Sequence, residues 1–260
     1  MLRVLMIGDI VGSPGRRVVA RLLPPLRQSE ALDFVVANAE NAAGGRGLTR
    51  PLAEELFAAG VDALTLGDHA WDQKEMVGQI EREPRLLRPH NLPPGCPGRG
   101  FATFATEAGP VTVLSLIGRT FMNVVADCPF RVADAMLRPD AAGGPTLVEM
   151  HAEATSEKIA MGWFLDGRAA AVVGTHTHVQ TADETIRPRG TAYLTDLGMS
   201  GPPDSVLGRD KESVLKKFLT GMPTRFEVAR GEAVLEGAVI EIETSSGRAL
   251  SIRRMRRTET

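Results

Sequence analysis

The sequence contains only two cysteines among its 260 residues, Cys96 and Cys128. Two thiols cannot build a disulfide framework, so we expect a reducing, intracellular location. No apolar stretch approaches the length of a membrane span, and the apolar start over residues 2–8 is too short for a signal peptide. These absences predict a soluble, cytoplasmic protein with no membrane partner.

The chain also has little excess of either charge. The formal net charge is −2, and the first long basic run is the tail Arg253–Arg257, which is interpreted as a solvated chain end. A groove that binds long nucleic acids through bulk electrostatics is therefore not supported, whereas a small phosphate-containing substrate stays open.

Short apolar runs alternate with helical stretches along most of the chain, which is typical of an α/β fold. We predict two mixed β-sheets packed face to face between helices, a layered sandwich with its site at the carboxyl ends of the strands. One domain is expected to span residues 1–260, including antiparallel strands from about residue 220. A turn is expected over residues 11–15 and a Pro- and Gly-rich loop over 89–100. The predicted strands cover residues 2–8, 34–37, 63–66, 101–106, 111–116, 146–150, 170–173, 225–229, 233–242 and 249–253, and helices are expected from about 16 and over 50–59, 71–80 and 156–165.

Polar side chains gather where the buried strands end, and four of the five histidines are among them. Taken singly, each has a structural explanation, such as a helix cap or an Asx turn. Those explanations would have to hold independently at five strand ends, and strand ends are where loops of α/β sheets form ligand sites. The residues are Asp9, Asn38, Glu40, Asn41, Asp68, His69, His151, His176 and His178.

Carboxylate, amide and imidazole donors without cysteine favour manganese, iron or zinc over a structural thiolate zinc site. A carboxylate can bridge two ions, and two ions about 3.5–4 Å apart would clamp the attacking and leaving oxygens of a phosphoryl transfer. A hydroxide that bridges them would be the nucleophile. If residues 176–178 are extended, His176 and His178 point to the same side. His69 could protonate the leaving oxygen as a general acid.

The order of these motifs resembles the calcineurin-like metallophosphoesterases, and more closely their YmdB branch of 2′,3′-cyclic-nucleotide phosphodiesterases. The resemblance covers most of the first 210 residues. It is carried by GDIVG (8–12), NAENAAGGRGLT (38–49), GDHAWD (67–72), HAEATSEK (151–158), GTHTHVQTADE (174–184) and TAYLTDLGMSGPPDSVLG (191–208).

The resemblance implies two metal ions and a role for each site residue. Asp9, Asn41 and His178 would bind the first ion, and Glu40 would bridge the pair. Asp68, His151 and His176 would bind the second ion, and His69 would be the proton donor. Iron is the metal usually associated with this branch, manganese is a common substitute, and zinc fits less well. The resemblance also implies a homo-oligomer.

Two positions depart from the pattern of the superfamily. Val11 stands where the superfamily has a histidine, a change that the YmdB branch shares. Asp68 stands where the family has asparagine. It adds a negative charge, so the bridging water should be less acidic than in the family, and Asp68→Asn should shift an alkaline optimum downward.

The leading hypothesis is hydrolysis of a small phosphodiester such as 2′,3′-cyclic AMP. A phosphomonoesterase or a broader phosphodiesterase could use the same metals. A metal-binding regulatory protein that acts through a partner is the alternative from another class.

Overall fold

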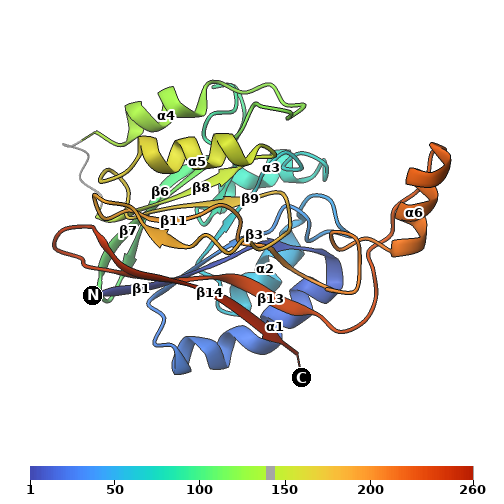
Figure 1. Cartoon of the computed structure of the whole chain (residues 1–260), viewed down its shortest axis with the longest axis horizontal. Helices are drawn as coiled ribbons and strands as arrows, with labels where there is room; N and C mark the ends of the chain where they lie inside the picture. The colour runs from blue at the N-terminus through green and yellow to red at the C-terminus, as the bar shows by residue number, and fades with distance from the viewer. Residues whose placement is uncertain (139–143, 260) are drawn as a thin grey trace.

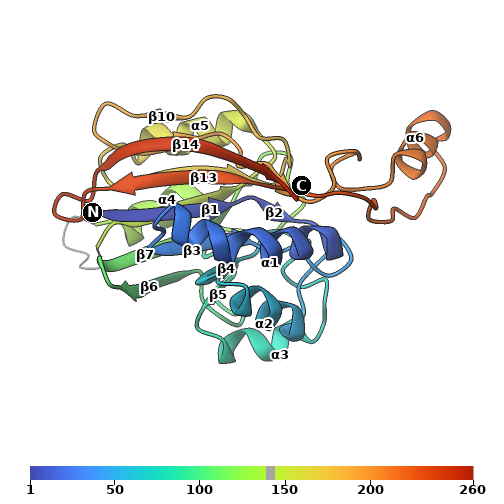
Figure 2. The same cartoon turned by 90° about the horizontal axis from the view of Figure 1, so that it is seen from below.

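Two six-stranded sheets pack face to face, and helices cover both outer faces (Figures 1 and 2). The computed structural model describes residues 1–138 and 144–259. Each sheet mixes parallel and antiparallel neighbours. The predicted α/β sandwich of two mixed sheets is therefore confirmed.

The first sheet has the order β14-β13-β1-β3-β4-β5. Its four parallel strands are β1 (Leu2–Ile7), β3 (Phe34–Asn38), β4 (Ala63–Thr65) and β5 (Leu86–Leu87). The strands β13 (Val234–Ile242) and β14 (Ala249–Thr258) run antiparallel to their neighbours. The whole length of β1 pairs with β13. The chain after residue 220 thus contributes to the same sheet as the first strand. Outside this sheet lie α1 (Gly12–Ser29), α2 (Arg50–Ala58) and the short α3 (Met76–Gln79), which a 3₁₀ turn (Ile80–Arg82) follows (Figure 2).

The second sheet has the order β10-β11-β9-β8-β7-β6, with α4 (Pro129–Met136) and α5 (Thr155–Phe164) on its outer face (Figure 1). A two-stranded parallel pair, β2 (Asp9–Ile10) with β12 (Met199–Ser200), joins the region after β1 to the late part of the chain. The helix α6 (Lys211–Thr220) projects away from the sandwich (Figures 1 and 2). The strands of the sheet are β6 (Phe101–Thr106), β7 (Gly109–Ile117), β8 (Thr146–His151), β9 (Ala171–Thr175), β10 (Thr185–Ile186) and β11 (Ala192–Leu194).

Strand β1 shows why the strand sequences are continuously apolar rather than alternating. Leu5 and Ile7 pack in the core beneath α1 and α2, whereas Val4 and Met6 pack in the core between the two sheets. Successive side chains of a strand point to opposite faces, so a strand that is covered on both faces needs apolar residues at every position.

Several predicted elements differ from the structure. Residues 12–15 form the first turn of α1 rather than a turn before it, because proline is tolerated in the first helical turn. Residues 71–75 form turns, so the predicted helix over 71–80 is wrong before Met76. The side chain of Gln73 in this stretch donates to the carbonyl of Arg46, 2.9 Å away, and ties it to the glycine-rich loop.

The end of the chain also differs. Residues 225–229 do not form a strand but make one isolated bridge, between Val228 and Arg209. The strand predicted over 249–253 continues to Thr258 as β14, so the basic tail is part of the sheet, and its four arginine side chains are exposed to solvent as expected. Helix α6 was not predicted, although Asp210 caps its first turn and Gly221 ends it in the left-handed conformation. In the portion of the chain that the structure describes, no helix is both long and apolar enough to span a bilayer.

Candidate metal centre

The predicted ligands meet between the two sheets, and each sheet contributes a different chemistry. The first sheet contributes the oxygen donors, which follow β1, β3 and β4. The second sheet contributes the imidazoles, which follow β8 and β9 or end them. Because the parallel strands of each sheet end at the same edge, these side chains converge there. The oxygen donors are Asp9, Glu40, Asn41 and Asp68, and the imidazoles are His151, His176 and His178.

Four of these residues form a tight cluster. One donor atom from each of Glu40, Asp68, His151 and His176 lies within 4.8 Å of the others. The Nε2 atom of His151 lies 3.1 Å from Oε1 of Glu40 and 3.0 Å from Oδ1 of Asp68. The Nδ1 atom of His176 lies 3.0 Å from that same Nε2 atom and 3.3 Å from Oδ1 of Asp68. Two carboxylates and two imidazoles thus point at one small volume.

Asp9 and His178 lie beside this cluster, and Asn41 follows Glu40 directly in the chain. The Nε2 atom of His178 is 3.8 Å from Oδ1 of Asp9, and the backbone N–H of His176 donates to Oδ2 of Asp9 at 3.1 Å. The amide nitrogen of Asn41 donates to the carbonyl of Gly45, which leaves its Oδ1 atom directed elsewhere.

Two buried oxygens in this second group have no hydrogen-bond partner among the described residues, Oδ1 of Asp9 and Oδ1 of Asn41. Buried acceptors without a partner are costly in a protein interior. A cation would satisfy both, and carboxylate and amide oxygens are suitable ligands for it. The donor set therefore fits a metal here as well as at the four-residue cluster.

The backbone at Gly67 leaves no room for a side chain beside these ligands. A Cβ atom at this position would lie 2.3 Å from Nε2 of His151 and 2.4 Å from Oε2 of Glu40. Glycine at residue 67 therefore permits the close approach of the chain after β4 to the cluster.

His69 lies at the edge of the cluster and is held from two sides. Its backbone N–H donates to Oε2 of Glu40 at 3.1 Å, and its Nδ1 atom lies 3.1 Å from Oδ2 of Asp72. A proton on Nδ1 shared with Asp72 leaves Nε2 as the atom that faces the cluster, 3.7 Å from Oδ2 of Asp68. This geometry suits a proton donor to a group bound at the metals.

Known proteins of similar sequence match nearly the whole chain. The family model described as YmdB-like protein matches residues 5–255. The chain belongs to the YmdB-like protein family. It is 48% identical over 255 residues to the 2′,3′-cyclic-nucleotide 2′-phosphodiesterase of Bacillus subtilis, covering 98% of this chain and 96% of the relative.

Two crystal structures have the same fold as this YmdB-like protein. A hypothetical protein of Thermus thermophilus superposes with a TM-score of 0.94 at 44% identity, with both chains fully covered. A protein described as a novel phosphatase from Mycoplasma pneumoniae superposes with a TM-score of 0.93 at 32% identity, covering 99% of this chain and 93% of that one.

The pKa values of the buried groups at the YmdB-like site are shifted by burial and by one another. Burial raises the pKa of Asp9. Burial alone would lower the pKa of His151, but the Glu40 and Asp68 carboxylates raise that pKa well above its usual range. Burial opposes ionisation of Glu40, yet His151 lowers the pKa of this carboxyl. The cluster thus balances its carboxylates with a proton on imidazole, and a metal ion would displace that proton.

A buried network behind His151 fixes which of its nitrogens faces the site. The Thr175 hydroxyl lies 2.8 Å from Oε1 of Glu149, to which it donates, and 2.9 Å from Nδ1 of His151. The hydroxyl therefore accepts from Nδ1, so Nδ1 carries hydrogen and Nε2 points to the cluster. Asn38 donates to the same Glu149 oxygen at 2.7 Å. Among the site residues predicted from sequence, Asn38 alone takes part in this supporting layer.

The loop of His176 and His178 is not extended, so the condition under which both side chains would point to the same side is not met. Both residues have positive φ, 92° and 61°, a conformation that non-glycine residues seldom adopt. Both imidazoles still reach the site, but on separate sides of it. Between them, the N–H and hydroxyl of Thr177 donate to Oδ2 of Asp196. The same carboxylate oxygen pairs at 2.7 Å with the fully buried Lys158, and this ion pair anchors the loop.

The remaining histidine, His90, is not part of this site. Its backbone N–H donates to the carbonyl of Ser115, and its ring packs 6.2 Å from that of Phe101. Sequence reasoning missed Asp72, Glu149, Thr175, Lys158 and Asp196. Polar residues in the middle of apolar runs, such as Glu149 in residues 146–150, were the available signal, because a buried charge requires a partner.

Proposed function

We propose that this YmdB-like protein hydrolyses phosphodiesters at a pair of metal ions, and that nucleoside 2′,3′-cyclic phosphates are its substrates. The observation that carries the proposal is the convergence of carboxylates from one sheet with imidazoles from the other in one cluster. Two further buried oxygens, Oδ1 of Asp9 and Oδ1 of Asn41, lack partners among the described residues. The name of the Bacillus subtilis relative, which aligns with nearly the whole chain, supports the substrate class.

The geometry supports the following ligand assignment. Asp9, Asn41 and His178 would hold the first ion, and Asp68, His151 and His176 the second. Glu40 would bridge the ions, as the family resemblance implies, and its Oε1 lies 3.1 Å from Nε2 of His151 in the second group. The carboxylates Asp9, Glu40 and Asp68 carry three negative charges, so two divalent ions leave one positive charge in the site. That charge favours an anionic phosphodiester.

When bound, two such ions would acidify a water and stabilise the charge that develops on the phosphoryl oxygens. The protein residues then orient the reactants. His69 would donate a proton from Nε2 to the leaving ribose oxygen, because an alkoxide is a poor leaving group without one. Asp72 would keep the ring of His69 in the orientation that this transfer needs.

We propose iron as the metal, with manganese as a substitute and zinc as the weaker candidate. Oxygen and imidazole donors without thiolate suit all three, and the resemblance to the YmdB branch favours iron. From composition and strand pattern we propose that the 260 residues act as one domain in the cytoplasm. Following the resemblance to the YmdB branch, we propose that the protein is a homo-oligomer. Light scattering on the purified protein would test the oligomeric state.

A phosphomonoesterase with the same metals is the second candidate, because the Mycoplasma pneumoniae structure with this fold is described as a phosphatase. Parallel assays with 2′,3′-cyclic AMP and with 3′-AMP would separate the two activities. Preference for the monoester would replace the proposed function.

The decisive experiment combines metal analysis with turnover of 2′,3′-cyclic AMP. We expect about two metal ions per wild-type chain, loss of metal in Glu40→Gln, and loss of turnover with retention of metal in His69→Ala. Absence of metal from the wild type would reject the metal centre. Metal without hydrolysis of any phosphoester would favour a regulatory protein that acts through a partner.

A further inference from the structure

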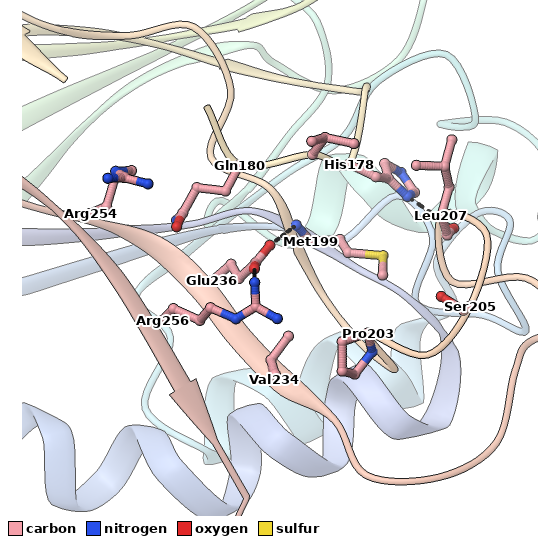
Figure 3. Close-up of a pocket in the computed structure, with 11 residues that line it drawn as sticks. His178, Gln180, Met199, Pro203, Ser205, Leu207, Val234, Glu236, Arg254 and Arg256 are labelled. Atoms are coloured by element: carbon pink, nitrogen blue, oxygen red, sulfur yellow. Dashed lines mark hydrogen bonds and ion pairs between the residues drawn. The ribbon is translucent and has the colours of Figure 1, made fainter. Parts of the chain in front are cut away.

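A cavity of about 500 Å³ opens directly beside His178 (Figure 3). One wall is the chain around Met199 to Leu207, and the other is formed by β13 and β14. Ligand sites for small molecules typically have volumes of about 300–1,000 Å³. The cavity is therefore large enough for a nucleotide-sized group, and it begins at a residue of the metal centre.

Two arginines of β14, Arg254 and Arg256, line the cavity at the side away from His178 (Figure 3). They lie two residues apart on one strand and so project from the same face of the sheet. Their neighbours Arg253 and Arg257 project from the opposite face, where both contact Glu30. The basic tail thus directs two of its four guanidinium groups into the cavity.

The polar groups around the cavity are held in place. Gln180 donates its amide hydrogens to the carbonyls of Leu197, Gly237 and Met255, which directs its Oε1 atom away from them as an acceptor. Glu236, whose side chain is only 7% exposed, accepts from the backbone N–H of Met199 and pairs with Arg256 at 3.1 Å.

Two guanidinium groups and one carboxylate line the cavity, and each arginine makes one ion pair, Arg254 with Glu184 and Arg256 with Glu236. Among the described residues that line it, Glu236 is the one acid, against Arg254 and Arg256. Arg256 is 57% exposed and Arg254 38% exposed, so both can reach a ligand. Arg254 also pairs with Glu184 through Nε, which leaves its terminal nitrogens available. Guanidinium groups bind phosphate through two parallel hydrogen bonds, so the chemistry offered here is that of a phosphate-binding site.

We propose that this cavity is a second phosphate subsite, which binds the phosphate that joins the terminal nucleoside of the substrate to the preceding one. The substrate class is then the 3′ end of an oligoribonucleotide that carries a 2′,3′-cyclic phosphate. The cyclic phosphate lies at the metals and the neighbouring phosphate lies at Arg254 and Arg256. This inference rests on the proposed function, and it names a substrate class that a mononucleotide assay would not reveal.

A subsite for one phosphate is compatible with a chain that has a net charge of −2. Affinity for long nucleic acids scales with the number of phosphates that are neutralised. Two arginines neutralise about one phosphate. A contact of this size can favour the 3′ end of an oligoribonucleotide, but it is too small to bind a long nucleic acid along a groove.

The test compares kcat/KM for 2′,3′-cyclic AMP with that for the dinucleotide ApA that ends in a 2′,3′-cyclic phosphate. We expect the wild type to favour the dinucleotide by about tenfold or more, as for a charge-assisted hydrogen-bonded contact. Arg254→Ala/Arg256→Ala should reduce this preference to about one, and Arg254→Glu should reduce it further. Raising the salt concentration should lower the dinucleotide rate more steeply than the mononucleotide rate, by a slope of roughly 0.7 for one phosphate.

Matched controls come from the same strand. Arg253→Ala/Arg257→Ala removes the same charge from the opposite face, and its preference for the dinucleotide should equal that of the wild type. Arg254→Lys/Arg256→Lys keeps the charge and should retain part of the preference, which separates phosphate binding from loss of folding.

The outcomes are distinguishable from failure of the proposed function. If the wild type hydrolyses neither substrate, the proposed function fails. If it hydrolyses both but the two pairs of alanine variants behave alike, only the subsite is rejected. If Arg254→Ala/Arg256→Ala relieves inhibition by inorganic phosphate without changing the substrate preference, the cavity binds a free anion and the assignment to a substrate phosphate is overturned.

Discussion

The Nδ1 atom of His151 lies 2.9 Å from the hydroxyl of Thr175, and that hydroxyl donates in turn to the buried Glu149. One threonine thereby determines which nitrogen of a metal-ligand candidate faces the site. Hydrogen-bond partners of metal-bound histidines strongly influence the affinity of a site for its metal ion, although they do not contact the metal.

Removal of that hydroxyl should weaken the metal centre. We expect Thr175→Val to lower metal affinity by about 10–100-fold, because the ring loses the acceptor that fixes its tautomer. Thr175→Ser keeps the hydroxyl and should bind metal nearly as tightly as the wild type. Competition with a chelator of known affinity measures the difference, and equal affinities for the Val and Ser variants would contradict this role.

The loss of turnover caused by His69→Ala should depend on the leaving group of the substrate. We expect His69→Ala to lower turnover of 2′,3′-cyclic AMP by about 10²–10⁴-fold. p-Nitrophenolate is a good leaving group without protonation, so turnover of a p-nitrophenyl phosphodiester should fall far less. Asp72→Asn should act in the same direction with a smaller effect. Arg46→Ala, which removes the other partner of Asp72, is the control. Equal losses on both substrates would argue against proton donation.

Asp68→Asn should retain activity and shift the alkaline pH optimum downward. The Oδ1 atom of Asp68 lies 3.0 Å from His151 and 3.3 Å from His176, so an amide oxygen can take the same place. Losing one negative charge strengthens the positive field that acidifies the attacking water. A pH–rate profile of the variant tests this, and an unchanged or higher optimum would count against the charge argument.

The buried pair Lys158–Asp196 should contribute to folding as well as to the loop. Both side chains are almost fully buried, so removal of one partner leaves an uncompensated charge. We expect Lys158→Met to lower the free energy of unfolding of the metal-depleted protein by about 3–5 kcal/mol. Lys211→Met breaks an exposed pair with Asp204 and should cost less than about 1 kcal/mol. Urea denaturation measures both, and similar losses would refute the distinction.

The single tyrosine provides a pH reporter that is independent of the metals. Burial raises the pKa of Tyr193 to about 12, from 10.0. A folded pKa above the unfolded one means that the stabilisation is complete below pH 10 and is lost as pH rises toward 12. Phenolate absorbance should therefore appear near pH 12 in folded protein and near pH 10 in denaturant. Coincident titrations would show that the ring is not buried.

Much of the architecture was predictable because it depends on local pattern. Apolar runs such as 34–37 and 63–66 predicted strands that are covered on both faces, and the order of the motifs predicted the family. Helix α6 was missed despite local capping signals at Asp210 and Gly221, whereas another error fell where contacts distant in sequence decide. Residues 71–75 turn instead of forming a helix because Gln73 and Asp72 contact the loop that carries Arg46.

The sequence alone predicted the candidate ligands, because acids, amides and histidines follow the ends of its predicted buried strands. The tertiary structure decided how they are divided, with oxygen donors on one sheet and imidazoles on the other. It also decided the positive φ of His176 and His178 and the position of Arg254 and Arg256 in the cavity that opens beside His178. The physical reason is that strand pairing brings β13 onto β1 from the far end of the chain, and no local pattern encodes such a contact.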